Sequence, residues 1–199
     1  MHKKDRRGTG ARKERSRLSY ILAFLPAVLF VGLLVFLLSA PPTTPPVTSI
    51  TSAGEKGEAP DFVLRRLTPN GLSDETFTLS SARGRVVFLD FAWWRCPHCN
   101  NMEPVIKDLY SEFSGRGVVC VTVLIDDRQS SVSESARFVA QHGISWIALW
   151  DEGSRVSGLY GVKGTPTYVI IDRNGKIVSA VSGEQPKEYL ASILNSVLG

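Results

Sequence analysis

The stretch VVFLDFAWWRCPHCNNMEP, residues 86–104, decides the fold. Its first six residues are an apolar run with a single acid, Asp90, and such a run is typical of a strand buried on both faces. Residues 97 to about 114 have the pattern of a helix. Cys96 and Cys99 therefore stand where a buried strand gives way to a helix, and this placement predicts a thiol–disulfide redox centre.

The spacing of the two cysteines suits disulfide exchange. Residues three apart share one face of a helix, so the sulfur atoms of Cys96 and Cys99 can meet. Pro97 fits the first helical turn, because the N–H that it lacks would be unpaired there. The helix dipole and the free N–H groups favour a thiolate at Cys96. We therefore expect Cys96 to be the nucleophile and Cys99 the resolving thiol.

A Cys-x-x-Cys pair also occurs in zinc sites. A structural zinc ion wants four ligands, usually from a second such pair. The remaining thiol, Cys120, lies within an apolar strand pattern, and the histidines outside the motif are His2 and His142. The sequence thus predicts redox use, with no metal and no cofactor beyond the cysteine pair itself.

Apolar runs and helical periodicity alternate over the rest of the chain. They predict strands at 118–125, 146–150, 166–172 and 176–181, and helices at 133–141 and 186–198. Asn174-Gly175, between the last two strands, is a strong signal for a type I′ hairpin turn. This order predicts an α/β fold with a mixed central sheet flanked by helices, and residues 59–199 are enough for one core.

The N-terminal quarter of the chain has a different character. Residues 1–17 hold eight basic and two acidic residues, and residues 18–40 carry no charge. As a helix the uncharged segment would be about 34 Å long, against about 30 Å of hydrocarbon in a bilayer. Residues 41–58 are rich in Pro, Thr and Ser and predict an extended spacer.

These segments predict a single-pass membrane protein. A basic cytoplasmic arm at 1–17, a transmembrane anchor at 18–40 and a linker at 41–58 would place the domain at 59–199 outside the cytoplasm, by the positive-inside bias. A cleaved signal peptide is the alternative, although its apolar region would be shorter.

The charge balance excludes other classes of function. The net charge of +4 comes from the arm, because the residues after it hold 15 basic and 17 acidic side chains. The domain is therefore not expected to bind nucleic acid. A single bilayer-length apolar segment also excludes a polytopic transporter.

At this point residues 59–199 resemble thioredoxin-fold thiol–disulfide oxidoreductases of the membrane-anchored TlpA/ResA/CcmG (DsbE) type. Asp90 stands six residues before the first cysteine, where thioredoxins keep a buried acid, and Pro104 matches the proline that kinks the active-site helix. Gly164-Thr165-Pro166-Thr167 matches the loop that carries a cis-proline. The resemblance implies a thioredoxin fold preceded by one N-terminal transmembrane helix.

The resemblance also implies residue roles. Pro166 would be cis, would shape the groove for an extended partner and would keep metals off the thiols. Thr165, just before it, would offer backbone hydrogen bonds to the partner chain. Asp90, if buried, would have a raised pKa and could exchange a proton with Cys99.

The two residues beside the nucleophile bear on the direction of electron flow. The Pro97-His98 pair between the cysteines resembles DsbA-type oxidases more than the reducing members of the anchored group. A histidine there, and Arg95 before the motif, would stabilise the Cys96 thiolate and make the disulfide more oxidising. The alternative is that Arg95 and His98 both face water and tune nothing.

The partners implied are extracytoplasmic proteins with thiols or disulfides, among them apocytochrome c, and a membrane redox partner that recycles the protein. Three other functions stay open. A peroxiredoxin would need Thr where Trp93 and Trp94 stand, and a copper carrier of the Sco type would need three residues between its cysteines. The third is an adhesion module without redox activity.

Overall fold

The computed structural model describes residues 57–127 and 131–199. The arm and anchor predicted at 1–17 and 18–40, and nearly all of the linker at 41–58, lie outside these residues. Within the two described ranges, no helix has both the length and the apolar character that crossing a bilayer demands.

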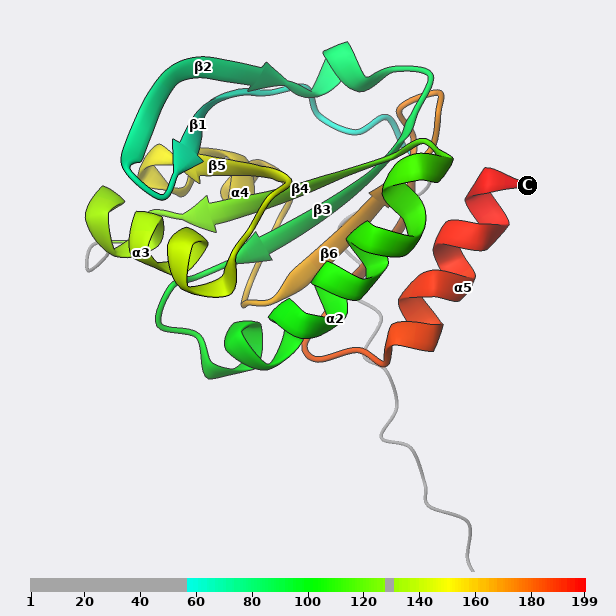
Figure 1. The fold of residues 1–199 in the computed structure, drawn as a ribbon. Coiled ribbons are helices and arrows are strands. Elements are labelled where there is room, and N and C mark those ends of the chain that lie inside the picture. Colours follow the sequence, from blue (N-terminus) through cyan, green and yellow to red (C-terminus); the bar gives the residue numbers. More distant parts are fainter. Residues whose placement is uncertain (1–56, 128–130) are drawn as a thin grey trace, which may run out of the picture. The chain divides into compact units, whose positions relative to one another are not determined.

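A seven-stranded sheet forms the centre of the fold, in the order β2-β1-β5-β4-β3-β6-β7 (Figure 1). The strands are β1 (Val63–Thr68), β2 (Gly71–Thr78), β3 (Val86–Ala92), β4 (Val118–Ile125), β5 (Ile147–Asp151), β6 (Thr167–Ile171) and β7 (Ile177–Ser182). β3 pairs in parallel with β4, and β4 with β5, while the outer pairs are antiparallel. The predicted α/β fold with a mixed sheet is confirmed.

Helices cover both faces of the sheet. They are α2 (Pro97–Phe113), α3 (Val132–His142), α4 (Arg155–Leu159) and α5 (Lys187–Leu198), with 3₁₀ turns η1 (Leu79–Ala82), η2 (Ser114–Arg116) and η3 (Glu152–Ser154). The apolar residues of α2, α3 and α5 join Phe88 and Tyr168 in one core cluster, and those of α4 and η1 join a second cluster on the other face. In Figure 1, α2 and α5 run side by side along the sheet.

The topology brings two distant loops together. β3 and β6 are antiparallel neighbours, with Phe91 opposite Thr167. The end of β3, which leads into α2, therefore lies beside the start of β6. Residues near 93–96 and 164–166 therefore meet at this end of the two strands.

The predicted type I′ turn at Asn174-Gly175 is wrong. A type I′ turn needs positive φ at both central residues, and Ser154 is the only non-glycine residue with positive φ in the described part of the chain. Gly175, at φ 79°, instead donates its N–H to Asp172 O (2.9 Å), in a three-residue loop closed by a left-handed glycine. The cause is the Asp172 carboxylate, which accepts the N–H groups of Asn174 and Lys176.

Candidate active site

The cysteine pair begins α2. Cys96 is the N-cap residue, Pro97 occupies the first turn, and the N–H of Cys99 donates to Cys96 Sγ (3.0 Å). Cys96 and Cys99 form a disulfide with their Cα atoms 5.2 Å apart. The two sulfur atoms meet at the positive end of a helix, where a thiolate is stabilised once the bond is reduced.

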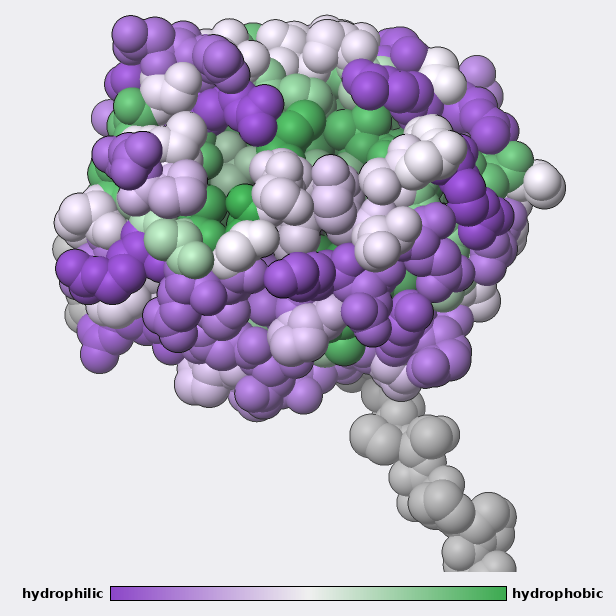
Figure 2. Space-filling model, viewed as in Figure 1, coloured by the Kyte–Doolittle hydropathy of each residue, from purple (hydrophilic) through white to green (hydrophobic). Residues whose placement is uncertain are grey.

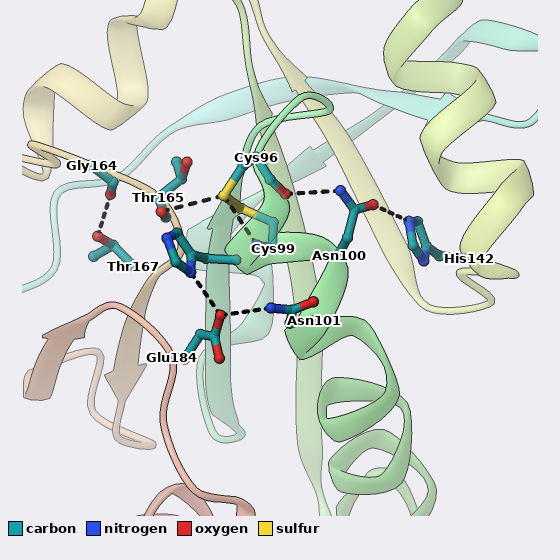
Figure 3. The surroundings of a disulfide bond; sticks show 10 residues. Cys96, Cys99, Asn100, Asn101, His142, Gly164, Thr165, Thr167 and Glu184 are labelled. Carbon is teal, nitrogen blue, oxygen red and sulfur yellow. Dashed lines mark hydrogen bonds and ion pairs between the residues drawn. A yellow bond between two sulfur atoms is a disulfide. The ribbon is translucent and has the colours of Figure 1, made fainter.

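The loop before β6 lies against this disulfide (Figure 3). The Thr165–Pro166 peptide bond is cis, and the carbonyl oxygen of Thr165 is 3.4 Å from Cys96 Sγ. Thr167 Oγ1 donates to Gly164 O (2.7 Å), which closes the loop on itself. Cys96 thus stands next to a backbone carbonyl that can accept a hydrogen bond from an extended partner chain.

Asp90 is buried behind the pair, with 1% of its surface exposed. It lies on the same face of β3 as Phe88 and Ala92, which share a core cluster with Cys99. Burial raises the pKa of Asp90 to about 7, against the lowering effect of a hydrogen bond from Thr122 Oγ1 (3.1 Å). Asp90 Oδ1 has no partner among the described residues.

Sequence reasoning missed a second buried acid, Glu103. It follows Cys99 by four residues in α2, so the two side chains are neighbours on the buried face of the helix. Glu103 is 3% exposed, and within the described ranges neither carboxyl oxygen has a hydrogen-bond partner. Burial, and then the charge of Asp90, raise the pKa of Glu103 to about 9. The detectable signal was its spacing from Cys99 and Ile106, which predicts the buried stripe of an amphipathic helix.

The side chains of Arg95 and His98 lie on the surface around the disulfide. The Arg95 guanidinium lies over the rings of Trp93 and Trp94, 5.9 and 5.5 Å from their centroids. His98 Nδ1 is 2.7 Å from Glu184 Oε1, in the segment between β7 and α5. The structure therefore brings both predicted tuning residues to the site, but it pairs His98 with a carboxylate that sequence reasoning did not find.

A further contact links the site to α3. His142 Nε2 is 2.8 Å from Asn100 Oδ1, and Asn100 Nδ2 donates to Cys96 O (2.9 Å; Figure 3). Because the Asn100 amide nitrogen is already the donor to Cys96, His142 Nε2 must donate to Asn100 Oδ1. His142 therefore holds the Asn100 side chain that supports the backbone of Cys96.

The surface over the start of α2 is polar. In Figure 2, hydrophilic residues dominate the lower part of the face, where α2 begins in Figure 1. In the part of the chain that the structure describes, no three His, Cys, Asp or Glu side chains are grouped to hold a metal ion. The side chains that meet at the site are two cysteines, which can exchange a disulfide, and buried acids, which can carry protons.

Comparisons with known proteins point to the same chemistry. A sequence profile of the AhpC/TSA family matches residues 56–180. The chain is 32% identical over 140 residues to thiol-disulfide oxidoreductase ResA of Bacillus thuringiensis (strain Al Hakam), covering 70% of this chain and 76% of that protein. It is 30% identical over 149 residues to ResA of Halalkalibacterium halodurans, covering 75% and 79%.

Solved structures are also similar. A putative thiol:disulfide interchange protein DsbE from Chlorobium tepidum matches with a TM-score of 0.67 and 31% identity, over 74% of this chain and 100% of that one. The thioredoxin domain of an oxidoreductase from Bacteroides vulgatus has a TM-score of 0.61 at 20% identity, over 74% of this chain and 100% of that one, which shows a shared fold alone.

Proposed function

Because the chain belongs to the AhpC/TSA family and to the thiol–disulfide oxidoreductases of the TlpA/ResA/CcmG type, we propose that it exchanges its disulfide with protein thiols outside the cytoplasm while tethered to a membrane. The observation that carries this proposal is the Cys96–Cys99 disulfide at the N-terminus of α2, beside the Thr165 carbonyl.

The exchange proceeds in two displacements. A substrate thiolate attacks Cys96 Sγ, the bond between Cys96 and Cys99 breaks, and its electron pair stays on Cys99 Sγ. A second substrate thiolate then attacks the substrate sulfur of the mixed disulfide, and Cys96 leaves as a thiolate. The substrate gains a disulfide, and this chain takes up two electrons. The reverse sequence reduces a substrate disulfide.

Protons follow the sulfur atoms. The Cys99 thiolate forms in the interior, where an uncompensated charge is unfavourable, so it needs a proton at once. Asp90 supplies it in the oxidising direction and accepts it in the reducing direction, because burial places its pKa near neutral pH. Glu103, one helical turn from Cys99, serves as a second proton reservoir.

We place the direction of electron flow on the oxidising side. The N–H of Cys99 and the helix dipole stabilise the Cys96 thiolate, and the Arg95 cation stands one residue away. Stabilising the thiolate stabilises the reduced form, which makes the disulfide a stronger oxidant. About 1.4 kcal/mol changes the exchange equilibrium tenfold.

The location rests on the sequence of the first 58 residues. Their basic arm and uncharged segment support a single-pass anchor with the domain outside the cytoplasm. Substrates would then be extracytoplasmic proteins that carry thiols or disulfides, with apocytochrome c, and thus cytochrome c maturation, among the candidates. A membrane redox protein would return the chain to its active state.

The test uses the full chain in detergent with a reduced dithiol peptide and a glutathione redox buffer. We expect the peptide to be oxidised and the reduction potential to lie above that of thioredoxin. C96S should abolish the reaction, and C120A, which removes the thiol outside the pair, should leave it unchanged. An inactive wild type, or a strongly reducing potential, would refute the reaction or its direction respectively.

A further inference from the structure

One carboxylate oxygen of Glu184 contacts two side chains at the start of α2. Its Oε1 lies 2.7 Å from His98 Nδ1 and accepts a hydrogen bond from Asn101 Nδ2 (2.9 Å; Figure 3). The partners lie 86 and 83 residues away in the sequence. The hydrogen bonds from Asn101 and His98 lower the pKa of Glu184, so the group is a carboxylate at neutral pH.

The backbone around Glu184 is fixed to the cis-proline loop. The N–H of Gly183 donates to Pro166 O (2.8 Å). The hydroxyl groups of Ser182 and Thr167 are in hydrogen-bond contact, and Gln185 Nε2 donates to Ser182 O (3.0 Å). Glu184 therefore joins the two segments that flank the disulfide, namely the loop at Pro166 and the start of α2.

This contact determines how His98 carries its proton. A carboxylate accepts and cannot donate, so Nδ1 of His98 bears a hydrogen directed at Glu184. Nε2 has no partner among residues 57–127 and 131–199, and 68% of the side chain is exposed. A carboxylate that fixes one ring nitrogen leaves the other as the working acid or base, which is the logic of the Asp–His pair in hydrolases.

We propose that Glu184 is a positioning residue, which fixes His98 with Nε2 free to carry the proton of the substrate thiol; this rests on the proposed function. In the oxidising direction Nε2 takes the proton of the incoming thiol while its sulfur attacks Cys96 Sγ. In the reducing direction the imidazolium returns that proton to the leaving substrate thiolate. The electron pair moves between sulfur atoms only, so atoms and charge balance.

The site then has two proton routes. The buried acids serve Cys99, which is hidden in the core, and the His98–Glu184 pair serves the substrate at the surface. Other ionisable groups lie on the elements around this pair. Tyr168 on β6 interacts with the charge of Glu184, Arg95 precedes the motif, and Lys187 on α5 is paired with Glu112 of α2 (3.2 Å).

The test measures how fast a reduced dithiol peptide reduces the disulfide of the full chain, followed by tryptophan fluorescence across pH. E184Q should lower the rate constant about tenfold near neutral pH, less than in an enclosed acid–base site because the pair is half exposed. The deficit should vanish at high pH, where the substrate thiol is ionised before it arrives. H98Q should show the same loss, and the double variant E184Q/H98Q no further loss.

The matched control is E112Q, which removes an ion pair between α2 and α5 whose carboxylate is about as exposed as that of Glu184, and it should keep the wild-type rate. Nitrogen-15 spectra of His98 should show the proton on Nδ1 in the wild type and its redistribution in E184Q. A wild-type rate in E184Q, additive losses in the double variant, or an unchanged tautomer would each overturn the inference. Failure of the proposed function would look different, because the wild type itself would not react.

Discussion

Replacing Glu103 by Gln should flatten the pH dependence of stability. The pKa of Glu103 is raised from 4.5 to about 9 in the folded protein, chiefly by burial. Between these two values the unfolded chain is ionised at this position while the folded chain keeps the proton. The folded state then binds more protons, so the free energy of unfolding falls as the pH rises through that interval.

The size of the effect follows from the interval. Each pH unit in this interval lowers the free energy of unfolding by about 1.4 kcal/mol. Ionisation at Glu103 therefore lowers the free energy of unfolding by at most about 4 kcal/mol between pH 5 and pH 8. For a protein of this size that corresponds to a fall in Tm of at most about 10–15 °C. E103Q keeps the shape of the side chain but does not titrate, so this part of the slope should disappear.

The assay is thermal unfolding of the full chain in detergent at pH 5, 6.5 and 8, followed by near-ultraviolet circular dichroism with the disulfide oxidised. Asp90, whose pKa is also raised by burial, should leave a smaller slope between pH 5 and 7 in both proteins. E112Q, at an exposed position of the same helix, should follow the wild type. Parallel curves for wild type and E103Q would refute the buried, protonated state of Glu103.

Three further predictions test the remaining assignments. C99S should accumulate mixed disulfides through Cys96 on a non-reducing gel, whereas C96S should capture nothing. D90N should slow attack by Cys99 on a mixed disulfide about tenfold or more above pH 7, measured by quenched flow, because the base with a pKa of about 7 is gone. G175A should lower the stability by about 1–2 kcal/mol in thermal unfolding while the exchange rate holds, since Gly175 has a φ of 79°.

The centre of the sheet could be predicted because it is buried on both faces. The expected strand at 118–125 coincides with β4, whose residues are apolar except for Thr122. The hairpin of β1 and β2 was not predicted, because it lies at the sheet edge and carries charge. Arg65 and Arg66 point to Asp74 and Glu75 across the pair, so few apolar residues mark the strands.

Local chemistry decided the turn that sequence reasoning misjudged. Asn-Gly suits a type I′ turn when the two strands join directly. Here the preceding Asp172 offers a carboxylate to two backbone N–H groups, which favours the longer loop. The dipeptide does mark a turn, but Asp172, two residues before it, determines which loop forms.

Some residues of the candidate site could be predicted from the local sequence, and others are brought to it only by the topology. Cys96, Pro97 and Cys99 are contiguous, so their geometry follows from helix rules alone. Glu184 reaches His98 only because β3 and β6 are neighbours and β7 returns the chain to the start of α2. No local pattern around Glu184 distinguishes it from an ordinary surface acid. The partners of the motif are therefore a property of the topology.

The pairing with Glu184 also changes what the Pro-His pair implies about direction. An isolated imidazolium beside Cys96 would favour the thiolate, but a carboxylate on the same ring offsets that charge at a distance. The proposed bias toward oxidation then rests on the N–H of Cys99, the helix dipole and Arg95. In this proposal His98 affects the rate of thiol–disulfide exchange and has little effect on the exchange equilibrium. A potential that changes little in H98Q, together with a slower exchange, is the combination that this division of labour requires.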